Sequence, residues 1–298
     1  MKKSRKVSSN LLSNIVVWGA AILFLFPTAW IYMTSIKPPS EYYTSPPKLL
    51  PDNPTVYHYY EAFFPEAIPN TYDEAQAYWV EEAAGKANPV TENLYNSIII
   101  TAAATVLSLF IGIPAAYALS RYRFKGGKDM AVWLLSTRMI PPIVTVIPLF
   151  FIINSVRLVD TQLGLIMIYI TINLPIVVWI LKGVFDEVPR ELEDAALVDG
   201  CTKPRAFVSV IFPLAIGGIV AAALFCVFLT WNEFLFALIM TRKEAVTLPV
   251  ALSTFRQDRG LLWGMMSATI VVATLPVMAI VFVLQKRVVQ GLLAGSSK

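Results

Sequence analysis

Six long apolar segments restrict the fold of this chain more than any other feature. A bilayer core of about 30 Å needs about 20 apolar residues in a spanning helix. The strands of a membrane barrel would instead be short and alternate in polarity. The sequence therefore predicts an all-α membrane protein with six transmembrane helices. The segments are Leu11–Ile36, Asn93–Ser120, Met130–Val156, Thr161–Leu181, Ala206–Thr241 and Leu261–Gln285.

The composition agrees with a membrane protein. Hydrophobic residues make up 56% of the 298 residues and charged residues 15%, whereas soluble domains carry about 25% charged residues. This argues against a soluble enzyme and a disordered chain. The net charge of +4 is too small to indicate nucleic acid binding. Two cysteines and one histidine argue against a disulfide scaffold and a structural zinc site.

The distribution of Lys and Arg predicts the orientation. Six spans place both termini on one side, and the segments on that side contain 15 Lys and Arg against 8 on the other. Lys and Arg favour the cytoplasmic side, so we expect cytoplasmic termini. The first apolar segment is longer than that of a signal peptide, which predicts an uncleaved helix. The segments on the side with 15 Lys and Arg are 1–11, 120–129, 182–205 and 286–298. Those on the side with 8 are 36–93, 154–162 and 241–260.

These expectations divide the chain into five parts. We predict a cytoplasmic N-terminus at 1–11, a first transmembrane helix at 12–36 and a periplasmic loop at 37–93. A core with five transmembrane helices follows at 94–285, and a cytoplasmic tail at 286–298.

Motifs of common enzyme classes are missing from the sequence. There is no G-x-x-x-x-G-K-[ST] phosphate loop, no H-E-x-x-H, no G-x-S-x-G and no C-x-x-C. We therefore predict no catalytic residue and no metal ligand, and we expect the chain not to bind ATP through a phosphate loop.

The segment between the fourth and fifth spans predicts a short cytoplasmic helix at 189–200. Pro189 is suited to the first turn of a helix and Gly200 to its C-terminal end. Acidic residues lie early in the helix, where the helix dipole favours negative charge. The residues alone leave two interpretations open, namely a docking element for a partner and a loop that covers the end of the bundle.

The same segment resembles a motif of ABC importer permeases, which reads EAA, three residues, Gly, nine residues, and I-x-L-P. Here Asp194-Ala195-Ala196 is followed at the same spacing by Gly200 and by Val210-Ile211-Phe212-Pro213. Asp replaces Glu, Val replaces Ile and Phe replaces Leu. The resemblance implies the type I ABC importer permease fold. It also implies that a coupling helix contacts the ATPase subunit through Glu193, Asp194, Ala195, Ala196 and Gly200.

Further segments resemble the smaller permease of maltose-type sugar importers. These are Asn93–Asp129, Thr137–Pro142, Trp231–Leu238, Thr247–Leu252 and the tail Gln290–Lys298. In that branch the tail reaches the ATPase subunits, which implies contacts by Gln290, Gly291 and Gly295. The loop segment 64–91 looks longer than usual.

The resemblance also implies partners. They are a second homologous permease, two copies of an ATP-binding subunit and a periplasmic solute-binding protein. ATP and Mg would be bound by the partner ATPase subunits, and no cofactor by this chain. The implied function is ATP-driven import of a carbohydrate or related solute by alternating access. Sugars, polyols and sugar acids all remain open as solutes.

Polar groups inside the apolar segments are candidates for a substrate path, because charges within a membrane span often have a function. The charged candidates are Arg138 and Glu233, and the polar ones are Asn173 and Asn232. Packing between helices is the alternative interpretation of each.

Two rival functions remain. A stand-alone secondary transporter or channel would need intramembrane ionisable groups as an ion relay, and only Arg138 and Glu233 qualify. A membrane enzyme would need a catalytic constellation, and none is recognisable.

Overall fold

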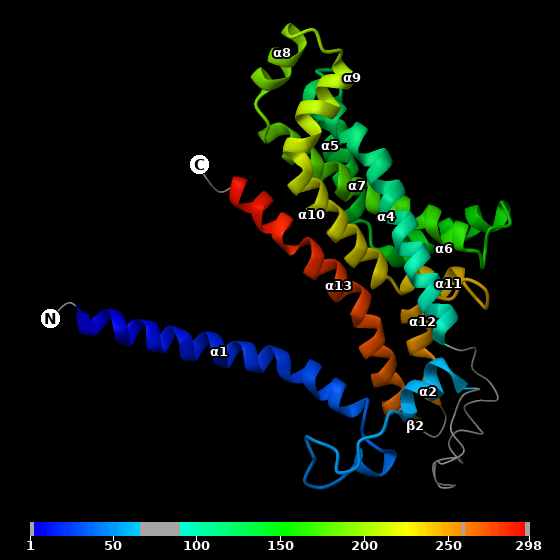
Figure 1. Ribbon diagram of the computed structural model, residues 1–298. Helices are drawn as coiled ribbons and strands as arrows, with labels where there is room; N and C mark the ends of the chain where they lie inside the picture. Colours follow the sequence, from blue (N-terminus) through cyan, green and yellow to red (C-terminus); the bar gives the residue numbers. More distant parts are fainter. Residues whose placement is uncertain (1–2, 66–89, 258–259, 296–298) are drawn as a thin grey trace. The chain divides into compact units, whose positions relative to one another are not determined.

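The computed structural model describes residues 3–65, 90–257 and 260–295 (Figure 1). The described chain is helical except for loops and one antiparallel pair of two-residue strands, β1 (Arg256–Gln257) and β2 (Gly260–Leu261). It divides into two compact units. Unit 1 covers residues 1–91 and 252–274, and unit 2 covers residues 92–251 and 275–298.

Unit 1 contains the first long helix and a loop region organised by a buried histidine. The elements are α1 (Lys3–Thr34), the 3-10 turn η1 (Pro39–Glu41), α2 (Tyr57–Phe63) and the first turns of α13 (Trp263–Gly295). The His58 Nε2 atom lies 2.7 Å from Tyr42 Oη and 2.9 Å from the carbonyl oxygen of Lys37. These contacts explain the histidine without a metal, and the described residues contain no group of three metal-binding side chains.

Unit 2 contains the other spans and the short helix between the fourth and fifth of them. Its helices in chain order are α4 (Val90–Arg121), α5 (Gly127–Ser136), η3 (Thr137–Met139), α6 (Pro142–Ser155), α7 (Gln162–Glu187), α8 (Arg190–Val198), α9 (Lys203–Ala206), the π-helical turn η4 (Phe207–Ile211), α10 (Phe212–Trp231), α11 (Leu235–Met240), α12 (Leu248–Ser253) and the end of α13.

The central helix of unit 2 is α7, because it contributes to both hydrophobic clusters of this unit. One cluster includes Leu165 and Ile168 together with Met240 of α11. The other includes Leu181 and Phe185 together with residues of α10. Half of the most apolar window of α7 is buried. A helix with apolar residues all round is expected in such a position.

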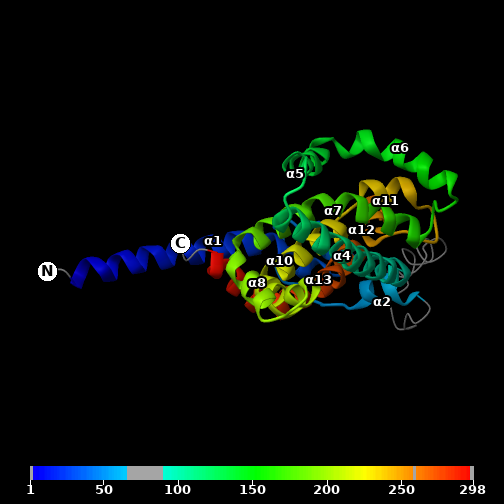
Figure 2. The same ribbon diagram turned by 90° about the horizontal axis from the view of Figure 1, so that it is seen from above.

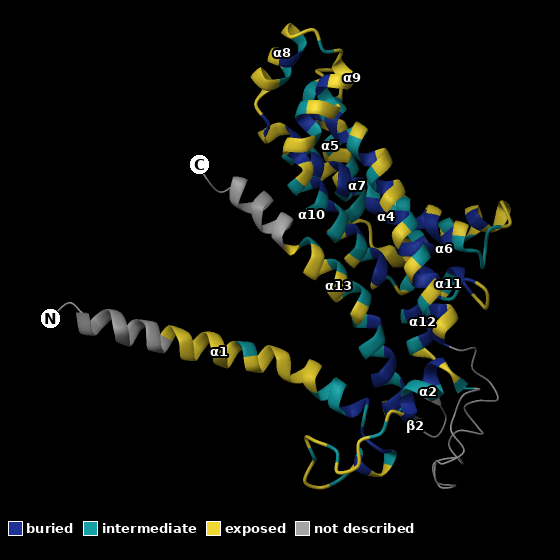
Figure 3. Cartoon of the chain, viewed as in Figure 1, coloured by how far each residue is buried: buried dark blue, intermediate teal, exposed yellow. Residues whose placement is uncertain are grey.

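Among the residues that the structure describes, five helices are long and apolar enough to cross a membrane, and each overlaps one of the six predicted spans. The first of them, α1, has none of its most apolar window buried, and its exposure is visible in Figure 3.

The third predicted span, Met130–Val156, is two helices instead of one. The axes of the segments Asp129–Met139 and Pro142–Ser155 differ by 98°, and the bend between α5 and α6 is seen in Figure 2. Pro141 and Pro142 explain the break. Proline lacks the N–H that a helix needs and disfavours the helical conformation of the residue before it. Ile140 and Pro141 accordingly have extended ψ angles of 125° and 131°.

The fifth predicted span, Ala206–Thr241, also ends earlier than expected. Its long helix runs from Lys203 to Trp231, and a separate short helix, α11, follows. The Glu233 side chain accepts hydrogen bonds from the backbone N–H groups of Phe236 and Ala237 in the first turn of α11. It therefore starts a new helix where the apolar pattern predicts continuation.

Candidate functional site

The helix α8 is the candidate coupling element, and its ends follow from local chemistry. Pro189 precedes its first residue, Arg190, and Gly200 has a left-handed φ of 87°. The N–H groups of Gly200 and Cys201 donate to the carbonyl oxygens of Leu197 and Ala196 at 3.1 and 3.0 Å. This is the Schellman arrangement that ends helices at a glycine. The helix is one residue shorter at its start and two at its end than the predicted range 189–200.

One side of α8 is an exposed stripe, which we call the outer stripe. Its members Glu191, Asp194, Ala195 and Val198 are all exposed, and they follow the spacing i, i+3, i+4 and i+7 of a single helix face. Val198 is 87% exposed. The stripe is thus acidic at one end and apolar at the other.

The structure divides the residues implied as ATPase contacts into two groups. Asp194, Ala195 and Gly200 are exposed, whereas Ala196 is buried and the Glu193 side chain is only 13% exposed. Glu193 lies on the side of α8 that faces the rest of unit 2.

Glu193 contacts the last turns of α4, and we call Glu193, Tyr117 and Arg121 the α4–α8 polar cluster. The Tyr117 hydroxyl donates to Glu193 Oε1 at 2.5 Å, and Arg121 Nε lies 3.1 Å from Glu193 Oε2. The Arg121 side chain is 6% exposed, and its Nη2 also donates to the carbonyl oxygen of Val188 at 2.8 Å. Neither Tyr117 nor Arg121 belongs to a predicted site.

Neighbouring contacts extend this cluster to α7. The Ser120 hydroxyl of α4 donates to Asp186 Oδ1 at 2.6 Å, and Arg190 Nη2 donates to the carbonyl oxygen of Ser120 at 3.0 Å. The Tyr117 ring packs 5.8 Å from Phe185 and 4.6 Å from Phe207 between centroids. The end of α4 therefore contacts α7, α8 and η4.

Two of the predicted substrate-path residues, Asn173 and Glu233, form side-chain hydrogen bonds with neighbouring elements. Asn173 of α7 is buried, and its Nδ2 donates to Thr230 Oγ1 of α10 at 2.8 Å. Tyr169, one turn earlier on α7, donates its hydroxyl to Glu233 Oε2 at 2.8 Å. Glu233 also accepts from the N–H groups of Phe236 and Ala237 at 2.9 and 3.1 Å. Glu233 thus has a clear structural role at the start of α11.

The other two substrate-path candidates lie in different surroundings. Asn232 is exposed, and its Nδ2 donates to the carbonyl oxygen of Phe228 at 2.9 Å. Arg138 is partly buried in η3, at the bend between α5 and α6.

Two predicted regions lie wholly or partly outside the described residues. Gln290, Gly291 and Gly295 belong to the last turns of α13, where the described structure does not include side chains. Most of the long loop segment 64–91 falls in the range 66–89, which is also outside the described part of the chain.

A carboxylate also organises the loop between α11 and α12. Asp160 Oδ1 accepts hydrogen bonds of 2.9 to 3.2 Å from the N–H groups of Arg242, Lys243, Glu244 and Ala245. Burial by itself raises the pKa of Asp160, but these four donors outweigh it and lower the pKa below its ordinary value. The loop precedes the segment Thr247–Leu252, whose sequence resembles sugar permeases.

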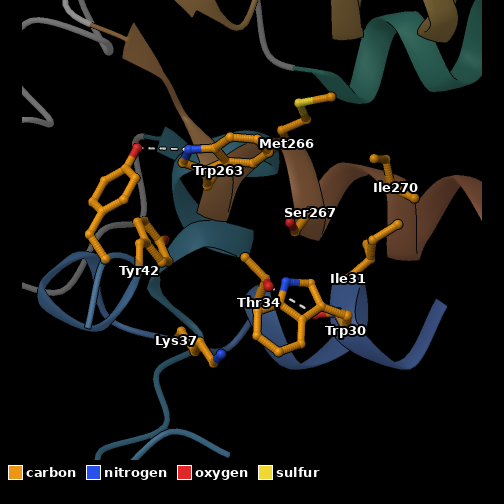
Figure 4. Close-up of a pocket in the computed structure, with 10 residues that line it drawn as sticks. Trp30, Ile31, Thr34, Lys37, Tyr42, Trp263, Met266, Ser267 and Ile270 are labelled. Carbon is orange, nitrogen blue, oxygen red and sulfur yellow. Dashed lines mark hydrogen bonds between the residues drawn. The ribbon is translucent and has the colours of Figure 1, made fainter. Parts of the chain in front are cut away.

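Unit 1 contains a pocket of roughly 310 Å³ between the end of α1 and the start of α13 (Figure 4). Aromatic side chains of Trp30, Tyr42, Tyr43 and Trp263 line it together with Lys37. The Lys37 ammonium lies 4.4 Å from the Trp30 ring centroid and donates to the carbonyl oxygen of Lys48. This lysine therefore already has partners within unit 1, and it does not by itself indicate a site for an anion.

Comparison with known proteins places these features in a family. The model of the family described as "Binding-protein-dependent transport system inner membrane component" matches residues 93–293. A probable ABC transporter permease of Sinorhizobium fredii is 32% identical and aligns over 98% of this chain and 97% of its own length. A trehalose transport system permease of Mycobacterium tuberculosis is 35% identical, over 97% and 96% of the two chains.

A solved structure shows the same fold. It is a bacterial ABC transporter involved in the import of the polysaccharide alginate, and it matches with a TM-score of 0.71 and 20% identity over 96% of this chain and 98% of the other.

These results confirm the predicted all-α membrane fold and its type I ABC importer permease architecture. They also confirm that the chain is a transport component and not an enzyme. The chain belongs to the family of binding-protein-dependent transport system inner membrane components, as a multi-pass permease of the ABC importer class.

Proposed function

We propose that this permease imports a carbohydrate or a closely related solute and is driven by ATPase subunits that bind the outer stripe of α8. Several relatives support the solute class. Their names assign them to transport of trehalose, of trehalose and maltose, of diacetylchitobiose and of sulfoquinovosyl glycerol. The rival interpretation as a stand-alone secondary transporter or channel is not favoured by membership of this family.

The geometry of α8 is the observation that supports the ATPase contact. Asp194, Ala195 and Val198 leave a partly apolar face of α8 exposed. An apolar side chain that is 87% exposed, as Val198 is, gains free energy when a partner buries it. The acidic end of the stripe gives the contact an orientation through charge.

The proposed complex contains further subunits. They are a second homologous permease, two copies of an ATP-binding subunit, which bind ATP and Mg, and a periplasmic solute-binding protein. Support for the last of these comes from a second solved structure with the same fold, a bacterial alginate ABC transporter in complex with an alginate pentasaccharide-bound periplasmic protein. We propose additional ATPase contacts by Gln290, Gly291 and Gly295 of the tail.

The proposed orientation places both termini and α8 in the cytoplasm, in agreement with the Lys and Arg distribution. ATPase closure would then displace α8 and switch unit 2 between outward-facing and inward-facing states. Arg138, Asn173, Asn232 and Glu233 are proposed to lie along the solute path.

The test of this function is a charge reversal on the outer stripe. In the complex co-expressed with its partner subunits, Asp194→Lys is expected to lower solute uptake in proteoliposomes at least about tenfold, equivalent to 1.4 kcal/mol, and to reduce co-purification of the ATPase. Glu187→Lys is the matched control, because Glu187 is also exposed but lies at the end of α7. Unchanged uptake and co-purification in Asp194→Lys would contradict the assignment of α8.

A further inference from the structure

Covalent connections join α8 to only some of the helices around it. Val188 and Pro189 link it to α7, and Asp199 to Thr202 lead to α9, η4 and α10. The helix α4 is not a neighbour of α8 in the chain, since 68 positions separate Arg121 from Pro189. A displacement of α8 therefore reaches α4 through non-covalent contacts and not through a direct chain connection.

The α4–α8 polar cluster is such a contact. Both carboxylate oxygens of Glu193 have a partner on α4. Tyr117 Oη donates a hydrogen bond to one of them at 2.5 Å, and Arg121 Nε lies at ion-pair distance, 3.1 Å, from the other without forming a hydrogen bond. The two charged side chains are 6% and 13% exposed. Separating a largely buried ion pair leaves uncompensated charge in a region of low dielectric constant. The pair therefore resists being pulled apart when α8 moves.

The cluster also determines how α8 is rotated about its axis. Tyr117 and Arg121 are one turn apart on α4, at positions i and i+4, so together they define a line along that helix. Glu193 contacts both of them, which places its neighbours Asp194 and Ala195 on the opposite, exposed side.

We propose that Glu193 is a positioning residue that transmits the displacement of α8 to α4 through Arg121 and Tyr117, and that it is not an ATPase contact. The inference rests on the proposed function of α8 as the ATPase-binding helix. It changes the role implied for Glu193 by the sequence resemblance, because a carboxylate with both oxygens engaged inside the permease is not available to a partner subunit.

The test uses the complete complex in proteoliposomes. Three quantities are measured for each variant: co-purification of the ATPase subunits, the ATPase rate with and without solute-loaded binding protein, and solute taken up per ATP hydrolysed. The variants are Glu193→Gln, Tyr117→Phe, Arg121→Glu, Glu193→Arg and the double variant Arg121→Glu/Glu193→Arg. Glu187→Gln is the control for removing an exposed carboxylate near α8.

We expect Glu193→Gln to keep the ATPase subunits bound and to lower uptake per ATP about tenfold. This corresponds to a coupling energy of about 1.4 kcal/mol, which lies in the range observed for residues in contact. Tyr117→Phe is expected to act in the same direction with a smaller effect. The double charge reversal is expected to raise uptake per ATP at least about threefold above that of Arg121→Glu. Glu187→Gln is expected to have the same uptake per ATP as the unmodified complex.

Different results separate this inference from the proposed function. If Glu193→Gln released the ATPase while Asp194→Lys did so too, α8 would still bind the ATPase, but Glu193 would be a direct contact and the inference would be overturned. If Glu193→Gln and Tyr117→Phe left uptake per ATP unchanged, transmission from α8 to α4 through Glu193 would be excluded and the inference would be overturned. A failure of the proposed function would instead appear as normal uptake in Asp194→Lys. If Arg121→Glu failed to fold, the two conservative variants would decide the question.

Discussion

At the residue scale, three carboxylates of unit 2 either accept hydrogen bonds from backbone N–H groups or join two helices. Glu233 accepts hydrogen bonds from the start of α11, Asp160 from the loop after α11, and Glu193 contacts α4. The sequence marks Glu233 as unusual because it interrupts an apolar segment. It does not show that backbone N–H groups a few residues later satisfy the charge.

Asp160 gives a prediction that depends on pH. We expect Asp160→Asn to lower the free energy of unfolding at about pH 7 by about 2 kcal/mol, a typical value for hydrogen bonds to a charged group. Because folding lowers the pKa of Asp160 from its ordinary value of 3.8, its stabilisation is complete above that value and is lost as the pH falls through the folded-state pKa. Thermal unfolding in detergent, compared between the two proteins over a pH series, measures this difference.

The pH series should show when the Asp160 carboxylate stabilises the fold. The difference in free energy of unfolding between the two proteins should stay constant from about pH 8 to about pH 5 and become smaller under more acidic conditions. A difference that widened with acid would show that the Asp160 carboxylate is not the stabilising group. Equal stability of both proteins at neutral pH would show that the loop does not depend on these hydrogen bonds.

Sequence spacing located the candidate coupling helix but not its inner contacts. The places of Asp194 and Gly200 on the helix can be predicted from the sequence, because the start and end of a helix fix which face each of its residues occupies. The partners of Glu193 lie 72 and 76 positions away. Tyr117 and Arg121 stand at the end of an apolar segment, where aromatic and basic residues are common in membrane proteins, so nothing local distinguishes them.

At the element scale, apolar length predicted most helices well and their interruptions poorly. Membrane helices tolerate proline where neighbouring groups satisfy the freed carbonyl oxygens, as Pro114 and Pro175 show inside α4 and α7. The adjacent pair Pro141 and Pro142 instead breaks the predicted third span. A single proline inside an apolar segment thus left the helix continuous, whereas two adjacent prolines ended it.

Close packing of α7 against α10 gives a second prediction. A Cβ atom at Gly218 of α10 would lie 2.3 Å from Cγ2 and 2.6 Å from Cγ1 of Val184 on α7. We expect Gly218→Ala to destabilise the protein by about 1–3 kcal/mol, because overpacking forces side chains and backbone apart. Thermal unfolding of the purified protein in detergent provides the measurement.

Gly183 on α7 is the control for this substitution. No atom lies within 4 Å of a Cβ built at Gly183, and alanine favours a helix over glycine by up to about 1 kcal/mol. Gly183→Ala should therefore leave the melting temperature equal or slightly higher. If both variants melted at the same temperature as the unmodified protein, the helices would be farther apart than the structure shows.

At the scale of the whole molecule, the class of protein follows from sequence more readily than its arrangement in the membrane. Six apolar segments and one spaced motif indicated the family, and the fold comparison agrees with it. The orientation rests on a modest excess of Lys and Arg. Such an excess is a statistical preference of insertion.

The two cysteines allow a direct test of the proposed orientation. Cys201 directly follows Gly200 and is partly exposed, whereas Cys226 is buried in α10. A membrane-impermeant maleimide is expected to label Cys201 in inside-out vesicles and to leave it unlabelled in intact spheroplasts. Cys201→Ser removes this signal and measures any reaction of Cys226.

In a protein without native cysteines, Leu49→Cys reports the opposite side, since Leu49 is 58% exposed in unit 1 and lies across one span from the N-terminus. The two positions should show opposite patterns of labelling. Labelling of Cys201 in intact spheroplasts would place α8 outside the cell, where no nucleotide-driven subunit reaches it, and would remove the physical basis for ATPase binding by the outer stripe.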